Sequence, residues 1–356
     1  MTSFAHPLRR GAAVLALVLL VAACGGEDAD PDRAAPGTSD APSTDVPGAD
    51  PIDDRPRSPF TGLPTDPDVL ARPLLVVKIE NSAPSRPQAG LDAADVVIEK
   101  QVEGGMTRFM ALLHGELPDV AGPVRSARPV DVDLLSGLGA SGLAYTGARA
   151  EVEGLLASTP SIRLDVSNPP GFRVEDRRAP HNLYIRPAEV LEVVERRGAR
   201  PLVDIGWVFD DIAPEGALTC PTSAPDCPDP GASVVIAFSN SFRTGWTYDA
   251  AAGVYRREQN GRPFLADGPG EIGAANVVVL ATRHYLGASG YPETDATTAG
   301  APAIVLRDGR RYEARWEKPT AADLLRILTL DGEPFPLKPG STWVHLPSAD
   351  RMPEVG

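Results

Sequence analysis

Three apolar runs in the first half of the chain most constrain how it can fold. Residues 74–81 read LLVVKIEN, residues 95–102 read DVVIEKQV and residues 107–115 read TRFMALLHG. Short continuous apolar runs bounded by turn residues are typical of buried strands. The last two runs flank the turn EGG, which predicts a β-hairpin. Alternation along the third run is expected to place Arg108, Met110, Leu112 and His114 on one face and Thr107, Phe109, Ala111 and Leu113 on the other.

Helical patterns separate further strands up to about residue 200. The strongest, residues 187–198, has Pro187 in its first turn and Gly198 at its end, as helices often do. Alternating strands and helices predict an α/β layer arrangement. Residues 165–186 lack this periodicity and are expected to form a long functional or disordered loop. The other elements predicted in this part are helices at 129–139 and 150–159 and a strand at 142–148.

The pattern changes after about residue 230. Short β-like runs alternate there with Gly, Asp and Asn, which is typical of an antiparallel sheet or a small barrel. The turns DAAAG (249–253) and DG (308–309) are predicted to close hairpins. We therefore predict an α+β protein with an N-terminal α/β domain (58–219), a linker (220–232) and a smaller, mainly antiparallel β domain (233–350).

The C-terminal part also contributes large aromatic side chains. Exposed aromatic rings on a sheet could stack on sugar rings, but Trp in a small β domain more often belongs to the core. We predict a core role for these residues, which are Trp246, Tyr248, Tyr255, Trp316 and Trp343.

The first 24 residues have the pattern of a lipoprotein signal peptide. Arg9 and Arg10 form a basic start, and residues 11–23 are small or apolar. This run is shorter than the about 20 residues that a membrane-spanning helix needs. It ends in VAAC, which resembles a lipobox, so Cys24 is expected to become the lipidated N-terminus with a palmitate anchor. The alternative is an ordinary secretory signal with a chance cysteine.

Residues 25–57 are predicted to be a disordered tether. They are acidic and rich in Pro, and they contain too few large apolar side chains to offset the entropy of ordering. The predicted location is the outer face of the cytoplasmic membrane, with the chain held there by its lipid. The formal net charge of −14 and the lack of a basic stripe argue against nucleic acid as a partner.

The cysteine count fits an exported protein. The chain has three cysteines, and lipidation of Cys24 leaves Cys220 and Cys227. Outside the cytoplasm this close pair is predicted to form a local disulfide. Zinc is a poor alternative, because two thiolates without nearby His or Cys partners do not complete a tetrahedral site. No metal or other cofactor is expected.

Three polar clusters fall in predicted loops and strand ends. Prolines stiffen the backbone around two of them, and guanidinium groups match the planar geometry of carboxylate or phosphate. The clusters therefore predict an anion-binding site in an otherwise acidic protein. Their members are Glu103 and Arg108; Arg125, Ser126 and Arg128; and Arg177, Arg178, His181, Asn182 and Tyr184.

A structural interpretation of the same residues is open. The arginines could be internal ion-pair partners of nearby acids, and His181 and Asn182 could be hydrogen-bonded loop anchors. The acids near enough in sequence are Glu99, Glu103, Asp131 and Asp133.

Evidence for an enzyme is weaker. Glu103 and His181 are candidates for acid and base. No G-x-S-x-G, H-E-x-x-H or Gly-rich phosphate motif is present, and Ser126 lacks the context of a nucleophile. We therefore favour a protein that is not an enzyme, with no catalytic residue assigned.

Several motifs, taken together and in order, resemble the YerB-like lipoproteins. They are PFTGLPTDP, IENSAPSRPQAGLDAADVVIEKQVEGGMTRFMALLHG, GPVRSARPVDVDL, RRAPHNLYI, WTYDAAAGVYRRE, LRDGRRYEARWEKP and LKPGSTWVHL. The resemblance covers most of residues 58–347. It implies an N-terminal α/β domain, a C-terminal β-rich domain and an envelope location, but no established reaction. One departure is Glu80, where the family pattern has Asp before Asn.

We expect a membrane-anchored envelope lipoprotein that binds an anionic ligand, such as a peptidoglycan fragment or the carboxylates of a partner protein. The expected ligand-binding residues are Glu103, Arg108, Arg125, Ser126, Arg128, His181, Asn182 and Tyr184. Two alternatives remain at this point: a wall-active hydrolase or lyase that uses Glu103 or His181, and a scaffold that docks another envelope protein.

Overall fold

The computed structural model describes residues 53–219, 230–267, 271–287 and 290–353. These residues belong to one compact unit that begins at Asp53. The lipobox with Cys24, most of the predicted tether and the Cys220–Cys227 pair lie outside the described residues. None of the helices in the described part of the chain has the length and apolar character that crossing a bilayer requires.

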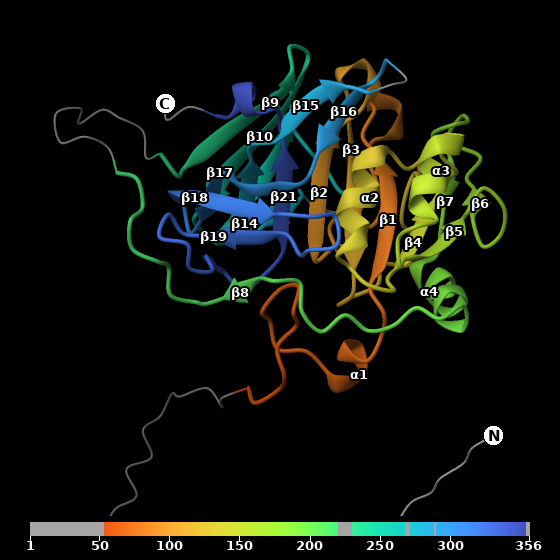
Figure 1. Ribbon diagram of the computed structural model, residues 1–356, viewed down its shortest axis with the longest axis horizontal. Coiled ribbons are helices and arrows are strands. Elements are labelled where there is room, and N and C mark those ends of the chain that lie inside the picture. Colours follow the sequence, from red (N-terminus) through yellow and green to blue (C-terminus); the bar gives the residue numbers. More distant parts are fainter. Residues whose placement is uncertain (1–52, 220–229, 268–270, 288–289, 354–356) are drawn as a thin grey trace, which may run out of the picture. The chain divides into compact units, whose positions relative to one another are not determined.

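A ten-stranded mixed sheet runs through the unit (Figure 1). Its strand order is β19-β18-β17-β14-β21-β2-β3-β1-β4-β5. The late strand β21 pairs in parallel with both β14 and β2, so it joins strands from the two halves of the sequence. The strands are β1 (Leu75–Glu80), β2 (Val96–Gln101), β3 (Thr107–Leu113), β4 (Gly142–Tyr145), β5 (Ile162–Asp165), β14 (Asn276–Leu280), β17 (Thr298–Arg307), β18 (Arg310–Lys318), β19 (Arg326–Leu328) and β21 (Thr342–Leu346).

A second sheet packs on one face of the first. It has the order β12-β11-β10-β9, with β13 paired to β11. Its strands are β9 (Ser233–Ser239), β10 (Phe242–Asp249), β11 (Val254–Gln259), β12 (Arg262–Pro263) and β13 (Gly273–Ala274). Three two-stranded ribbons complete the strands: β6 (Phe172–Arg173) with β7 (Leu183–Tyr184), β8 (Val208–Phe209) with β20 (Pro336–Leu337), and β15 (Arg283–Leu286) with β16 (Pro292–Asp295).

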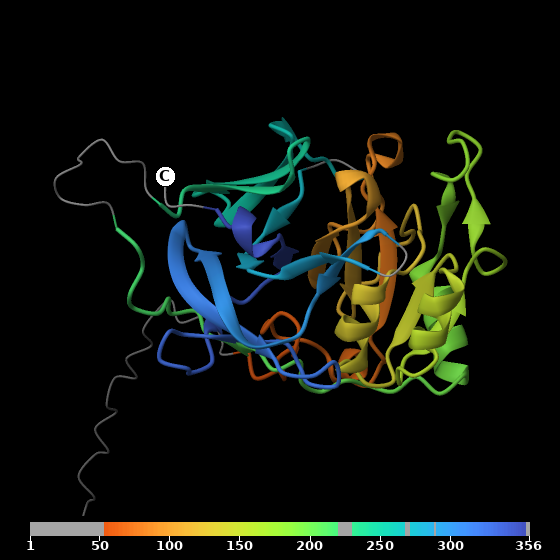
Figure 2. The same cartoon turned by 45° about the horizontal axis from the view of Figure 1, so that its top comes forward.

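Helices cover both faces of the large sheet in the part formed by β1, β4 and β5. The apolar sides of α2 and α3 join one core cluster, whereas α4 joins the other. Figure 1 shows α2 and α3 side by side in front of the sheet, and Figure 2 shows β17 and β18 as a long curved hairpin. The helices are α1 (Pro67–Leu70), α2 (Pro129–Ser136), α3 (Ala150–Leu156) and α4 (Pro187–Arg196), with short 3-10 turns η1 (Ala83–Ser85), η2 (Glu103–Gly105) and η3 (Ala349–Arg351).

The predicted alternation along residues 107–115 is confirmed. Phe109, Ala111 and Leu113 pack in the core between the two sheets, whereas Met110 and Leu112 pack beneath α2 and α3. The hairpin of β2 and β3 around the EGG turn is also confirmed. The predicted core role of the aromatic residues holds for the four that are buried, Trp246, Tyr255, Trp316 and Trp343, while Tyr248 is half-buried.

The fold is mixed and strand-rich, in agreement with the broad prediction. The predicted hairpins at 249–253 and 308–309 are present. The stretch 165–186, predicted without regular structure, contains the short β6–β7 hairpin. Strands of both predicted domains share the ten-stranded sheet, so the predicted linker at 220–232 does not separate two sheets. The division into two domains therefore remains a prediction.

Candidate anion-binding site

Two polar side chains at the end of β1 lie on opposite faces of the large sheet. Glu80 is the last residue of β1, and Asn81 follows it. Neighbouring residues of an extended chain point to opposite faces. Glu80 contacts His181 on one side, while Asn81 contacts Glu99 on the other. The two residues thus belong to two polar networks, one on the α2 side and one between the sheets.

The network on the α2 side contains more cationic groups than carboxylates. Its five cationic residues, called the cationic cluster below, are Lys78, Lys100, Arg108, Arg125 and Arg128. The carboxylates that lie among them are Glu80, Glu103 and Asp131.

Two lysines of the cluster are completely buried and share one carboxylate. Lys78 Nζ lies 2.8 Å from Asp131 Oδ1, and Lys100 Nζ contacts the same oxygen. The other carboxylate oxygen, Oδ2, accepts a hydrogen bond from the backbone N–H of Arg128 at 2.7 Å. Burial lowers the pKa of both lysines well below its usual range, and the charges of Arg108 and Arg128 act in the same direction.

Arg108 is the least compensated member of the cluster. Arg108 is only 8% exposed, and its Nη1 atom donates a hydrogen bond to the Ser126 carbonyl oxygen at 3.0 Å. Arg128 Nη1 lies 3.5 Å from the same oxygen. Among the described residues, Arg108 forms no ion pair with a carboxylate. Burial, followed by repulsion from Arg128 and Arg125, lowers the pKa of Arg108. An anion beside Arg108 would relieve that repulsion.

Arg128 is paired, as the structural interpretation of the sequence predicted. Its Nε atom lies 2.7 Å from Glu103 Oε1. Burial alone would raise the pKa of Glu103, but a hydrogen bond from its own backbone and the charge of Arg128 lower it. A carboxyl group held ionised in this way is poorly suited to donate a proton.

Glu80 links His181 and Arg125. Both carboxylate oxygens of Glu80 lie 3.0 Å from His181 Nδ1. Arg125 Nη1 lies 3.9 Å from Glu80 and donates to the Pro180 carbonyl oxygen at 3.2 Å. The Nε atom of Arg125 is buried and has no hydrogen-bond partner among the described residues. Glu80 therefore orients the imidazole and keeps Arg125 beside Arg108.

The structure brings parts of all three sequence clusters together. Arg108 and Arg128 meet at the Ser126 carbonyl, and Arg125 reaches the loop that carries His181. Other predicted residues contact neighbouring segments instead. Asn182 accepts a hydrogen bond from Arg173, Arg177 donates to the carbonyls of Ser85 and Pro87 and lies over the ring of the buried Tyr184, and Arg178 is exposed.

The crevice that borders the cationic cluster on the described surface is shallow. A crevice lined in part by Glu103, Arg128, Arg149 and Tyr291 has a cavity volume of about 10 Å³, enough for roughly one water molecule. A much larger groove of about 740 Å³ lies along β17 and β18 and is lined mostly by small apolar residues, but it contains no predicted site residue. A ligand of the cationic cluster would therefore bind from the surface.

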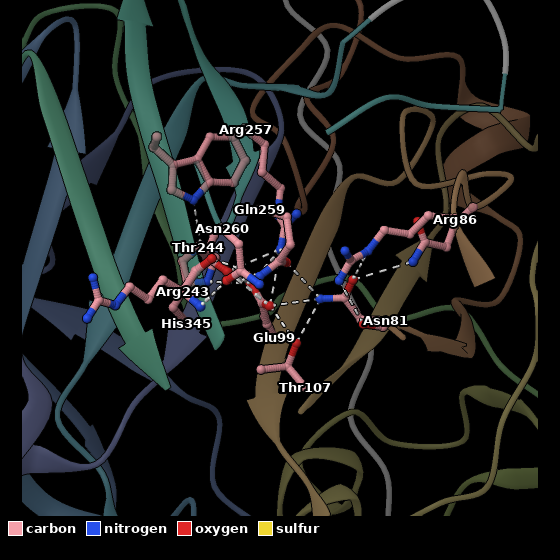
Figure 3. A network of polar contacts seen from close by, with 12 residues as sticks. Asn81, Arg86, Glu99, Thr107, Arg243, Thr244, Arg257, Gln259, Asn260 and His345 are labelled. Atoms are coloured by element: carbon pink, nitrogen blue, oxygen red, sulfur yellow. Dashed lines mark hydrogen bonds and ion pairs between the residues drawn. The ribbon is translucent and has the colours of Figure 1, made fainter. Parts of the chain in front are cut away.

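The second network lies between the two sheets (Figure 3). Glu99, fully buried, accepts hydrogen bonds from Asn81, Thr107, Thr244 and Arg257. Its Oε2 atom lies 3.0 Å from His345 Nδ1. His345 Nε2 accepts a hydrogen bond from the indole N–H of Trp246 at 2.9 Å, so the neutral ring carries its proton on Nδ1, the ring nitrogen nearer to Glu99.

Aromatic rings enclose the cation of this second network. The guanidinium carbon of Arg257 lies 3.9 Å from the ring centre of Phe264 and 5.2 Å from those of Phe109 and Trp343. Such contacts offset part of the cost of burying a charge. Residues of both sheets thus surround a closed polar network, and its buried setting points to a structural role.

Sequence reasoning missed several residues of the site. Lys78 and Lys100 lie within runs read as buried strands, and Glu80 was noted only as a departure from the family pattern. The available signal was a charged side chain inside an apolar run, because charged residues are rarely buried without a partner.

Comparisons with known proteins agree with this architecture. Residues 60–200 match the family model described as “Protein of unknown function (DUF3048) N-terminal domain”, and residues 234–344 match the corresponding C-terminal domain. The chain is 27% identical to “Putative lipoprotein YerB” of Bacillus subtilis (strain 168), over 82% of this chain and 86% of the relative. The crystal structure of the Bacillus subtilis YerB protein matches with a TM-score of 0.71 at 24% identity, over 83% of this chain and 98% of that one, which shows a shared fold.

Proposed function

The chain belongs to the DUF3048 family, as its motifs predicted, and on this basis we propose that it is a lipid-anchored envelope protein that binds an anionic ligand. The ligand would contact the surface of the cationic cluster at Arg108, Arg125 and Arg128. The family has no established reaction, so the proposal depends on the geometry of these residues.

The sequence and the relative support the anchor. The VAAC motif places Cys24 where a lipid is attached to bacterial lipoproteins, and the Bacillus subtilis relative carries the word lipoprotein in its name. A lipid on Cys24 would hold the compact unit at the outer face of the cytoplasmic membrane, beyond the segment predicted as a tether.

The observation that carries the ligand proposal is that Arg108 has no carboxylate within ion-pair distance among the described residues. A buried guanidinium between two other arginines is costly without an anion. Carboxylate and phosphate groups both accept paired hydrogen bonds from guanidinium. Both occur in the cell envelope, and a peptidoglycan fragment with free carboxylates fits the predicted location.

We predict that Arg108→Met weakens binding to purified cell wall by about tenfold or more, because a hydrogen bond to a charged group contributes about 1.5–3 kcal/mol. The measurement is the bound fraction of the full chain over a range of wall concentrations. Arg310→Met is the matched control, since Arg310 is exposed on β18, far along the sheet order from β3. Equal binding by wild type and Arg108→Met, with both folded by thermal melt, would remove the cluster from the ligand site.

One observation favours an enzyme as a second candidate. Glu80 holds His181 through Nδ1 and leaves Nε2 as the ring atom that could accept a proton from a substrate beside Arg125. The same wall-binding assay tests this, because a hydrolase or lyase would release soluble wall fragments and His181→Gln would stop their release. If the protein neither binds wall nor releases fragments, the third possibility, docking of another envelope protein, gains support.

A further inference from the structure

We propose that the side chains of Lys100 and Asp131 become joined by an amide bond that ties β2 to α2. The three groups concerned are Lys78 on β1, Lys100 on β2 and Asp131 on α2. All three side chains are completely buried, and both lysine nitrogens contact Asp131 Oδ1. The inference is independent of any ligand of the cationic cluster.

The charges of the three groups do not balance while both lysines are protonated. One carboxylate cannot neutralise two ammonium groups whose side chains are completely buried, and Arg108 and Arg128 add further positive charge nearby. One lysine is therefore expected to be neutral. Lys100 fits the role of the neutral amine, because its nitrogen lies closer to Asp131 Oδ1 than the nitrogen of Lys78 does.

A neutral amine in a desolvated site beside another cation is an activated nucleophile. The carbon atom it would attack, Cγ of Asp131, carries two oxygens in different settings. Oδ1 faces the two lysines, whereas Oδ2 is held by the backbone N–H of Arg128. Oδ1 is thus placed to leave, and Oδ2 is placed to remain as the carbonyl oxygen of the new amide.

The step balances without any external reagent. The Lys100 nitrogen attacks Cγ and forms the C–N bond, and the C–Oδ1 bond breaks. Oδ1 leaves as water with one proton from the Lys78 ammonium and one from the Lys100 amine. The products are a neutral amide, a neutral Lys78 and one water molecule, so none of the three buried groups carries a charge afterwards. The closed packing around the bond would also protect it from hydrolysis.

Tryptic digestion of the wild-type full chain tests the proposal directly. Trypsin does not cut before proline, so Arg86 and Arg128 are not cleavage sites. A linked Lys100 is not cut either. The expected product is residues 79–108 joined to residues 126–149, with a mass one water molecule below the sum of the two peptides. Separate peptides 79–100, 101–108 and 126–149 at full yield would overturn the proposal.

Three variants test the assigned roles, and a fourth is the control. Lys100→Met removes the attacking amine and should abolish the linked product, as should the double variant Asp131→Asn/Lys100→Met. Lys78→Met keeps both reacting groups but removes the proton donor, and we expect at least a tenfold drop in the linked fraction. Lys338→Met, which alters a partly exposed lysine paired with Asp308, should leave the linked fraction unchanged. A fully linked Lys78→Met protein would overturn the role of Lys78 as the proton donor.

Discussion

A Glu99→Gln substitution is expected to lower the free energy of unfolding by about 3–5 kcal/mol, because it leaves a buried guanidinium without its counter-charge. Arg257 is 1% exposed, and its Nη2 atom donates to both carboxylate oxygens of Glu99 at 3.1 Å. The Nε and Nη1 atoms of Arg257 have no hydrogen-bond partner in the part of the chain that the structure describes, and the guanidinium lies among aromatic rings. The carboxylate is thus the one group of opposite charge that the guanidinium contacts among the described residues.

Urea unfolding at pH 7 measures this change, with tryptophan fluorescence and circular dichroism as two independent probes. Trp246 and Trp343 border the network and report on it directly. The matched control is Glu192→Gln, which removes an exposed carboxylate on α4 and should cost less than about 0.5 kcal/mol. A loss below about 1 kcal/mol for Glu99→Gln would mean that the ion pair is not needed, since that is the size of one ordinary hydrogen bond.

A double variant distinguishes two costs: the lost attraction between Glu99 and Arg257, and the burial of an unpaired Arg257 charge. Glu99→Gln/Arg257→Met removes both charges and keeps side chains of similar length. It is expected to be more stable than Glu99→Gln, because replacing both partners of a buried pair is much less costly than removing one. A double variant that is as unstable as the single one would place the cost in packing instead.

The strands that build both networks could be predicted from sequence. The runs at 74–81, 95–102 and 107–115 are long and apolar. A strand that is buried on both faces can be recognised from such a run without knowing which strands it pairs with. Alternation then placed Arg108 on the face opposite Phe109, which the core packing confirms. Local chemistry therefore predicted the elements and the direction of their side chains.

The pairing of charges could not be predicted in the same way. Asp131 meets Lys78 and Lys100 only because α2 packs on the sheet, across separations of 53 and 31 residues. Arg257 reaches Glu99 from a second sheet, 158 residues away. Contacts of this range depend on tertiary packing, and a single sequence carries no signal for them beyond a charged residue in an apolar run.

Local sequence patterns also could not predict that strands from both halves of the sequence share one sheet. TWVHLP reads as one more short strand of the C-terminal part, but β21 inserts between β14 and β2 in parallel with both. His345 on β21 consequently lies beside Glu99 on β2. The Glu99 network thus depends on the strand order, which explains why its members were not grouped at the sequence level.

The second large effect is expected in acid: the stability advantage of wild type over Glu99→Gln should shrink by about 3 kcal/mol as the pH falls from about 6 to about 2. Burial alone would raise the pKa of Glu99, but Arg257 and His345 outweigh it and lower the pKa from 4.5 to about 2. The unfolded chain therefore binds this proton first. The contribution of Glu99 is complete above pH 4.5 and is lost as the pH falls towards 2.

His345 acts with the same sign at higher pH. Burial lowers its pKa below 6.5, so the unfolded chain takes up a proton before the folded one, and stability falls as the pH drops below 6.5. Urea midpoints of wild type, Glu99→Gln and Glu192→Gln at intervals from pH 7 to about pH 2 separate the two groups, because only Glu99→Gln removes the carboxylate of the network. If wild type and Glu99→Gln lost stability in parallel over this whole range, Glu99 could not be the ionised partner that holds Arg257 between the sheets.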